Sequence, residues 1–261
     1  MSFSYTDGMP GSIQSVERAA AILRLFRSES RRLGVAELSQ ALDLPKGTVH
    51  GILRTLRQVG FVEQDAGTGK YMLGAGVLRL GAEYPDANEL RSAALSGADS
   101  LAARSRESVR VGALHGDRVL VVHHVFRPDH SAQVLDVGSV LPLHASALGK
   151  VIAGYDPLAA QVLSGAGLPR YTDRTITSAR ELQAALARLR ARGWGADVGE
   201  RVAGEASIAA PIRGRQGLTV GAIGISGPVE RLCAMGEPRP DLVSQVRAAA
   251  CAVAYGVAGK R

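Results

Sequence analysis

The segment Leu44–Val59, LPKGTVHGILRTLRQV, predicts an amphipathic helix around which the N-terminal region is organised. Its apolar residues recur at the i, i+3, i+4, i+7 spacing of one helix face. They are Val49, Ile52, Leu53, Leu56 and Val59. The opposite face carries Lys46, Gly47, His50, Gly51, Arg54, Arg57 and Gln58, and no carboxylate. Because a solvated helix face normally mixes acids with bases, this face indicates a surface for phosphates and base edges.

The neighbouring segments predict that this helix belongs to a winged helix-turn-helix. A first helix, with Ser15 as its N-cap, and a short second helix over residues 35–42 precede it. Short helix, tight turn and amphipathic helix in succession form the helix-turn-helix arrangement. Residues 61–63 and 70–73, joined by a glycine-containing turn, then predict a β-hairpin, the wing. A plain surface hairpin with a solvated Lys70 is the alternative for this segment.

The remaining chain divides into a linker and a second domain. Residues 1–12 are expected to be a disordered tail, 13–75 the winged helix-turn-helix, and 76–85 a linker helix that ends at a proline. Residues 86–261 form the second domain. Strands are predicted there over 109–114, 119–126, 133–137, 141–143, 207–212 and 219–226, with helices between them. Two hairpins with flanking helices indicate an α+β fold around one antiparallel sheet.

Composition bounds the class of protein without choosing a function. The chain has 261 residues, of which 46% are hydrophobic and 21% charged, as in a soluble globular protein. A net charge of +7 permits an anionic partner but does not require one. No apolar run approaches the roughly 18 residues of a membrane span, so we expect no membrane partner. The two cysteines, Cys233 and Cys251, fit a reducing cytoplasm.

The sequence lacks the residue spacings that known catalytic and metal-binding motifs require. The sequence holds no phosphate-binding loop, no dinucleotide fingerprint and no nucleophile elbow. His123 and His124 are adjacent on a predicted strand, so their side chains point to opposite faces and cannot share one metal ion. We therefore predict no catalytic residue, no metal site and no cofactor, and regard an enzyme with a winged-helix appendage as the weaker hypothesis.

Four stretches together resemble one family of proteins. They are SVERAAAILRLF (15–26), LPKGTVHGILRTLRQVGFVE (44–63), LPLHASALGKV (141–151), and RARGWGADVGERVAGEASIAAPI (190–212) followed by GAIGISGP (221–228). The chain is similar in these to the IclR family of bacterial transcription regulators. More narrowly, KGTVHGILRTL, VVHHVFRPD and VERLC resemble actinobacterial glycerol operon regulators. The resemblance implies that residues 86–261 form a GAF-like domain that binds an effector and oligomerises. It also implies a cytoplasmic homodimer or homotetramer on palindromic, double-stranded operator DNA.

The predicted DNA-binding residues lie on the amphipathic helix and beside it. They are Arg18, Lys46, Gly47, Thr48, His50, Gly51, Arg54, Arg57 and Lys70. We expect Lys46, Thr48, His50 and Arg54 to face base edges or adjacent phosphates, and Arg18, Arg57 and Lys70 mainly to neutralise phosphates. Many family members have arginine where this chain has Gly51. The glycine either permits close approach of the backbone to DNA or reflects drift.

The predicted effector pocket is carried over from the family, residue by residue. It comprises Ala147, Leu148, Asp197, Ser207 and Ser226. Family members that bind small carboxylates have a further hydroxyl where this chain has Gly224, which argues against an identical ligand. The Asp197 carboxylate would repel a phosphate unless it faced the hydroxyl end of the ligand. Phosphate recognition needs a cation such as Arg110 or Arg201, neither of which the sequence places.

The sequence therefore favours a repressor of a glycerol catabolic operon that responds to glycerol 3-phosphate or glycerol. An IclR-type regulator of another catabolic pathway, sensing a small organic acid, is the alternative. A third hypothesis is a DNA-binding protein whose C-terminal domain only oligomerises and binds no ligand.

Overall fold

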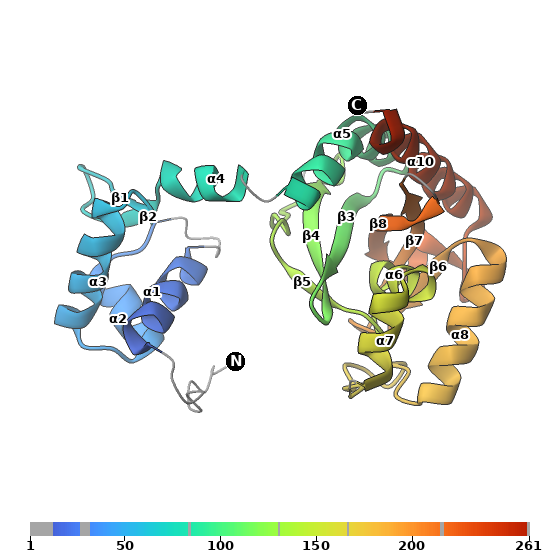
Figure 1. Ribbon diagram of the computed structural model, residues 1–261, viewed down its shortest axis with the longest axis horizontal. Helices are drawn as coiled ribbons and strands as arrows, with labels where there is room; N and C mark the ends of the chain where they lie inside the picture. The colour runs from blue at the N-terminus through green and yellow to red at the C-terminus, as the bar shows by residue number, and fades with distance from the viewer. Residues whose placement is uncertain are drawn as a thin grey trace. The chain divides into compact units, whose positions relative to one another are not determined.

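The computed structural model describes residues 13–26, 32–82, 85–129, 131–165, 167–214 and 217–259. The chain divides into two units, Met1–Tyr84 and Pro85–Arg261 (Figure 1). Each unit contains its own cluster of buried apolar side chains. The predicted disordered tail, residues 1–12, lies outside the described residues.

The first unit is a winged helix-turn-helix, as predicted. Its elements are α1 (Gln14–Leu25), α2 (Val35–Leu42), α3 (Lys46–Gln58), β1 (Val62–Gln64) and β2 (Tyr71–Leu73). The two strands pair antiparallel and form the wing. The core is built from Ile22, Phe26, Leu38, Val49, Leu53, Leu56, Val62 and Tyr71. The amphipathic pattern of α3 thus buries one face of the helix and leaves the polar face outside.

Two local predictions in this unit were wrong. Ser15 is not the N-cap of α1, because the helix begins at Gln14 and Ile13 occupies the cap position. Val59 does not continue the apolar stripe of α3, because the helix ends at Gln58 and leaves Val59 53% exposed. Both errors lie at helix ends, where the sequence pattern is least decisive.

Two helices follow the wing, one on each side of the break that the sequence predicts at Pro85, and the first corresponds to the expected linker helix over residues 76–85. The first, α4, spans Ala75–Ala82 and belongs to the first unit. Pro85 is the first residue of α5 (Pro85–Ser105), in the second unit. A proline is tolerated in the first turn of a helix, since its missing N–H would have no intrahelical partner there.

The second unit is built on one antiparallel sheet in the order β5-β4-β3-β8-β7-β6, which confirms the predicted α+β fold. The strands are β3 (Ser108–His115), β4 (Arg118–Val125), β5 (Val140–Pro142), β6 (Gly195–Val198), β7 (Glu205–Arg213) and β8 (Thr219–Pro228). The strand predicted over residues 133–137 is absent from this described segment. There the Gln133 side chain bonds the backbone of Arg127 instead, and the segment forms a loop.

Helices cover both faces of this sheet (Figure 1). One face packs against α5 and α10 (Pro240–Gly259) through a core that includes Val109, Ile208 and Ile225. The other face packs against α6 (Ala147–Tyr155), α7 (Pro157–Gly165) and α8 (Ala179–Arg192). A short helix, α9 (Val229–Leu232), and a small hairpin, β9 (Cys233–Ala234) with β10 (Glu237–Pro238), precede α10. Alternation along β3, β7 and β8 therefore sends successive side chains to opposite helical layers.

Candidate functional sites

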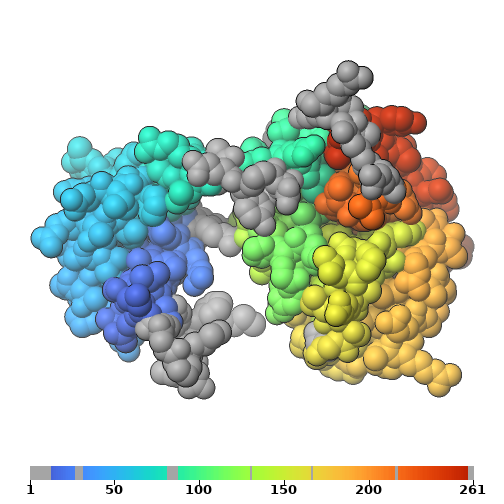
Figure 2. All heavy atoms as spheres, in the orientation of Figure 1, coloured from blue at the N-terminus to red at the C-terminus, as the bar shows by residue number. Residues whose placement is uncertain are grey.

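The polar face of α3 lies at the surface of the first unit. Figure 2 shows this part of the chain in light blue, on the left of the view. Five of its predicted DNA-binding positions are exposed, namely Lys46, Gly47, His50, Arg54 and Arg57, and two are partly buried, Thr48 and Gly51. Arg18 is partly buried on α1.

The N-terminus of α3 is electrostatically suited to an anion. No side chain of the described residues caps it at Pro45, and its first turn contains no acidic residue. The positive end of a helix dipole disfavours a cation, so Lys46 at the first position does not stabilise the helix by charge. Free backbone N–H groups beside a lysine provide instead a site for a phosphate oxygen.

The two glycines of α3 fill no structural role inside the first unit. A Cβ atom added at Gly47 or Gly51 would meet nothing within 4 Å among the described residues. Packing within the protein therefore does not require glycine at either position. What the missing side chains change is the outer surface, where they let another molecule come closer to the helix backbone.

Arg57 and Lys70, two of the predicted DNA-binding residues, are held by protein partners at the wing. Arg57 donates from Nη1 to Oε1 of Gln64 at 2.9 Å, which ties the end of α3 to β1. Lys70 Nζ lies 3.0 Å from Oε1 of Glu37 on α2. The pKa of Glu37 is lowered, first by the N–H of Gly34 and then by Lys70. Lys70, which we predicted to neutralise a DNA phosphate, is therefore ion-paired in the protein without DNA.

The register of the sheet explains how the predicted pocket residues converge. Asp197 on β6 pairs with Ser207 on β7, and Ser207 pairs with Ser226 on β8. On the far side of β8, Ser226 pairs with Ser108 of β3. These four polar residues form one row across four strands. Two residues further along, Gly224 pairs with Arg110, and the period of two places this pair on the same face.

A cavity of about 420 Å³, including the solvent at its mouth, opens on this face. Its lining contains all five residues predicted for the effector pocket, Ala147, Leu148, Asp197, Ser207 and Ser226. It also contains Arg110 and Arg201, the two cations that the sequence left unplaced, together with Glu205 and Gly224. Apolar walls with a few placed polar groups are typical of a small-molecule site.

The first turn of α6 supplies one wall of the cavity. Ser146 is its N-cap: the hydroxyl accepts the N–H of Gly149 at 3.1 Å and donates to the carbonyl of Pro142 at 2.7 Å. Ala147 and Leu148, the first two helical residues, line the cavity. The positive end of the α6 dipole thus lies at the pocket wall, where it favours a negative group.

Asp197 is a buried carboxylate engaged mainly by the turn that follows β6. Its Oδ1 accepts the N–H of Glu200 at 2.7 Å, and its Oδ2 lies 3.5 Å from the Ser207 hydroxyl. Burial raises the pKa of Asp197 to about 6, although the Glu200 N–H and the charge of Lys150 oppose the change. Lys150 itself forms a buried ion pair with Glu200. Asp197 therefore organises the turn and offers a single oxygen towards Ser207.

Arg110 is the cation on the opposite wall. Its Nη1 donates to the hydroxyl of Ser226, and its Nε and Nη2 reach Oδ2 of Asp136 at 2.6 and 2.5 Å. The N–H of Asp136 is donated to Nδ1 of His124 at 3.1 Å, so Nε2 carries the proton that His124 donates to Ser108 at 2.7 Å. Burial, aided by the charge of Arg110, lowers the pKa of His124 to about 4. The histidine is thus a neutral support beside the pocket.

Gly224 is required by the packing of the sheet. A Cβ atom at this position would lie 2.5 Å from the carbonyl oxygen of Ile208 and 2.9 Å from Cβ of Ala209. Neither neighbour can move without displacing β7. A hydroxyl-bearing side chain at this position is therefore excluded by the backbone, and the space opposite β3 is available to the side chain of Arg110.

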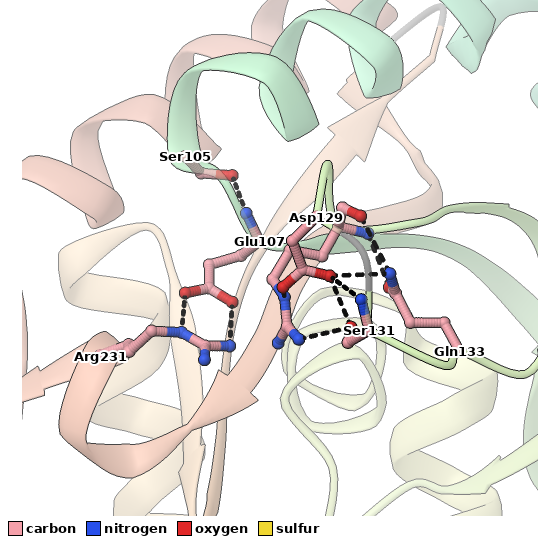
Figure 3. Close-up of polar contacts among 7 residues, drawn as sticks. Ser105, Glu107, Asp129, Ser131, Gln133 and Arg231 are labelled. Atoms are coloured by element: carbon pink, nitrogen blue, oxygen red, sulfur yellow. Dashed lines mark hydrogen bonds and ion pairs between the residues drawn. The ribbon is translucent and has the colours of Figure 1, made fainter.

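A second polar cluster lies outside the pocket, where the ends of α5 and β4 approach α9 (Figure 3). Both oxygens of the buried Glu107 accept from Arg231, at 2.6 and 2.9 Å. Nearby, Asp129 accepts the N–H and the hydroxyl of Ser131, at 3.0 and 2.5 Å, and pairs with Arg127. These bonds join α9 to the residue that precedes β3 and fix the beginning of the loop after β4.

The described residues contain neither a metal-binding cluster nor a helix that could span a membrane. No group of histidine, cysteine or acidic side chains in these segments is arranged to hold a metal ion. No helix in the same segments combines the length and the apolar character needed to cross a bilayer.

Comparison with known proteins identifies the family. The IclR helix-turn-helix domain matches residues 15–66, and the C-terminal domain of bacterial transcriptional regulator IclR matches residues 82–255. The glycerol operon regulatory protein of Streptomyces coelicolor is 53% identical over 97% of this chain and 100% of its own length. Its namesake from Streptomyces griseus is 50% identical over 97% of this chain and 100% of its own length.

A solved structure agrees with the sequence comparison. An IclR homolog from Microbacterium hydrocarbonoxydans, crystallised with 4-hydroxybenzoate, has a TM-score of 0.76 and 25% identity, covering 94% of this chain and 99% of its own. The relatives are transcription regulators and not enzymes, which rules out the enzyme hypothesis. The chain belongs to the IclR family of bacterial transcription regulators, whose members bind DNA and small-molecule effectors.

Proposed function

We propose that this regulator represses a glycerol catabolic operon in the cytoplasm. The observation that carries the proposal is the 53% identity, over essentially the full length of both chains, to the glycerol operon regulatory protein of Streptomyces coelicolor. The first unit binds double-stranded operator DNA. The domain of residues 86–261 binds the effector and forms the homodimer or homotetramer, so that two recognition helices meet the two halves of a palindromic site.

On the DNA side, the exposed face of α3 supplies the contacts. Lys46, Thr48, His50 and Arg54 face base edges and neighbouring phosphates, while Gly47 and Gly51 let the helix approach the groove. Support for this assignment comes from the exposed cations and from the open space over both glycines. Arg18, Arg57 and Lys70 neutralise phosphates, and Lys70 must then exchange Glu37 for DNA.

On the effector side, glycerol 3-phosphate or glycerol binds the cavity of the second unit. Ser207, Ser226 and Oδ2 of Asp197 suit hydroxyl groups, and the arginines in the lining suit a phosphate. The effector controls transcription because it binds one arrangement of the two DNA-binding heads better than the other. Only this difference in affinity shifts the equilibrium between the DNA-competent and incompetent states.

A mobility-shift assay tests whether the protein recognises operator DNA by its sequence, as the proposal requires. The purified chain is titrated against duplexes from upstream of its own gene and of glycerol catabolic genes, at about 0.15 M salt with unrelated competitor DNA. We expect retained complexes with one or both duplexes in excess competitor. Binding that the competitor abolishes equally for target and unrelated duplexes would contradict the proposal.

The alternative function is regulation of another catabolic pathway by a small organic acid. It is supported by the 32% identity to the transcriptional regulator KdgR of Escherichia coli over 86% of this chain, because that relative is not named as a glycerol operon regulator. Thermal-shift screening distinguishes the two, because glycerol or glycerol 3-phosphate should raise the melting temperature under the main proposal. A rise with organic acids alone would favour the alternative, and no rise with any ligand would favour a domain that only oligomerises.

A further inference from the structure

Arg110 occupies a place in the pocket that its cross-strand partner leaves open. Directly opposed residues of an antiparallel pair present their side chains on the same face, and Arg110 is opposite Gly224. Because Gly224 has no side chain, the arginine can lie along β8 and reach the hydroxyl of Ser226, two residues away. The guanidinium is thereby held at the same row of polar groups as Ser207 and Asp197.

Among the described residues, the protein engages only part of the guanidinium. Ser226 takes one N–H of Nη1, and Asp136 takes Nε and one N–H of Nη2. Each terminal nitrogen of an arginine carries two N–H groups, so a second one on Nη1 and on Nη2 remains outside these bonds. The side chain of Arg110 is 19% exposed, and Arg110 is part of the cavity lining. The planar fork therefore has donors left for an acceptor inside the cavity.

The counter-ion of Arg110 comes from a segment that is anchored elsewhere. Asp136 lies on the loop between β4 and β5, with its carboxylate 30% exposed. The beginning of this loop is fixed by Asp129, Ser131 and Gln133, as Figure 3 shows, and none of these bonds involves Asp136. The Asp136–Arg110 pair is therefore a separate contact, which can open while the loop stays attached.

The charges of the cavity point to the kind of ligand that would open it. One oxygen of Asp197, Oδ1, accepts the Glu200 N–H, and the second cation, Arg201, pairs with Glu205 at 3.7 Å. Arg110 faces the cavity together with the positive end of α6. An uncharged ligand would leave the ion pair between Arg110 and Asp136 intact. A ligand with an anionic group offers the same charge as Asp136 and adds contacts that Asp136 does not make.

We propose that Arg110 makes this pocket selective for an effector with an anionic phosphate or carboxylate group, and that this group takes Arg110 from Asp136. The inference rests on the proposed function only in assuming that a small metabolite binds this cavity. For the glycerol assignment it selects the phosphate ester and excludes glycerol itself. Arg110 is thus a specificity-determining residue, and Asp136 is an internal competitor of the effector.

Calorimetric titration of the full-length protein tests both parts, with glycerol 3-phosphate, glycerol and pyruvate as probes. Arg110→Gln removes the charge but keeps a group that can bond Ser226. Asp136→Asn weakens the competitor and leaves its N–H bond to His124 in place. Arg118→Gln is the matched control, because it removes one positive charge from β4 at a residue paired with Asp117 and outside the cavity lining. Thermal melting establishes that each variant is folded.

We expect the wild type to bind an anionic probe at least about tenfold more tightly than glycerol, as a charge-assisted bond implies. Arg110→Gln should abolish this preference, Arg118→Gln should keep it, and Asp136→Asn should tighten anion binding several-fold. A purely structural role for Asp136 would instead weaken binding in that variant. Unchanged anion affinity in Arg110→Gln, weaker binding in Asp136→Asn, or no binding of any probe to the wild type would overturn the inference.

The same titrations separate the inference from the proposed function. If glycerol binds and both anions fail, anion selection is wrong while the glycerol assignment stands. If pyruvate binds in an Arg110-dependent manner and glycerol 3-phosphate does not, the glycerol assignment is wrong while anion selection stands.

Discussion

Gly51 is the residue at which helix stability and DNA recognition make opposite demands. A glycine in a helix interior costs about 1 kcal/mol relative to alanine, and no described residue fills the space over Gly51. We therefore expect Gly51→Ala to raise the free energy of unfolding by about 0.5–1 kcal/mol in denaturant titrations. If close approach to the groove explains the glycine, the same variant should bind operator DNA more weakly. Unchanged operator affinity would indicate drift.

Arg54 and Lys70 differ in how freely each can meet DNA. Arg54 is exposed on the recognition face, whereas Lys70 is bound to Glu37. Arg54→Ala should weaken operator binding by about 1–3 kcal/mol and non-specific binding much less. Lys70→Ala should weaken both alike and by a smaller amount. Anisotropy titrations with operator and unrelated duplexes measure the four constants, and equal losses from the two variants would contradict the assigned roles.

Glu37→Gln is the matched variant for the lysine, since it leaves Lys70 in place and removes the competing charge. It should strengthen binding to both duplexes, provided that Lys70 contacts a phosphate. The pairing itself was beyond sequence analysis, because it joins residues 33 positions apart through two flexible side chains. Sequence reasoning also named Arg110 without placing it, since its role depends on a register with β8 that only the folded sheet provides.

At the scale of elements, the helices were predicted more accurately than the strands. The second helix over residues 35–42 agrees with α2 at both ends, because its apolar spacing and the flanking turn residues are unambiguous. The strand β6 was not predicted: Gly195–Val198 is short and contains Gly195 and Asp197, two residue types that strands disfavour. The reverse error is the strand predicted over residues 133–137, a segment whose apolar residues Val134, Leu135 and Val137 are exposed and lie in a loop.

The N-caps of α6 and α8 form a natural pair for separating stability from ligand binding. Ser146 and Ser178 each accept an N–H of the first turn, but only Ser146 lines the cavity. Ser178→Ala should cost about 1 kcal/mol of unfolding free energy and leave effector affinity unchanged. Ser146→Ala should cost more, about 2 kcal/mol, since the buried carbonyl of Pro142 also loses its donor. Ser146→Ala should also weaken effector binding. Equal effector affinities in the two variants would show that the N-terminus of α6 is not part of the site.

At the scale of the whole molecule, Asp197 couples folding stability to pH. Its pKa is raised from 3.8 to about 6, so between these values the folded protein holds a proton that the unfolded chain has released. The stabilising contribution is therefore complete below about pH 4 and is lost as the pH rises through 6. We expect the stability of Asp197→Asn relative to wild type to increase by up to about 3 kcal/mol between pH 4 and 7.

Chemical denaturation of both proteins across this pH range measures the difference. The pKa of His124 is lowered to about 4, so its contribution to the free energy of unfolding is lost as the pH falls, opposite to that of Asp197. Because His124 is present in both proteins, this contribution cancels in the difference between them. A constant difference between the two proteins across the range would show that Asp197 is not desolvated in the folded state.

The presence of two separate units could be predicted because each has its own sequence pattern. A recognition helix with a wing in one, and strands with capped helices in the other, are local signals. The pocket residues came together only through resemblance, since Ala147 and Ser226 are distant in sequence and meet through the packing of α6 on β8.

The most direct test of the whole account is operator binding by the wild-type protein with and without the effector. Fluorescence anisotropy with a duplex from upstream of a glycerol catabolic gene, at about 0.15 M salt, gives both constants. We predict tight binding relative to an unrelated duplex, and a loss of at least about tenfold on addition of glycerol 3-phosphate. Equal affinity for the operator and the unrelated duplex, or an operator affinity that no pocket ligand alters, would contradict the account.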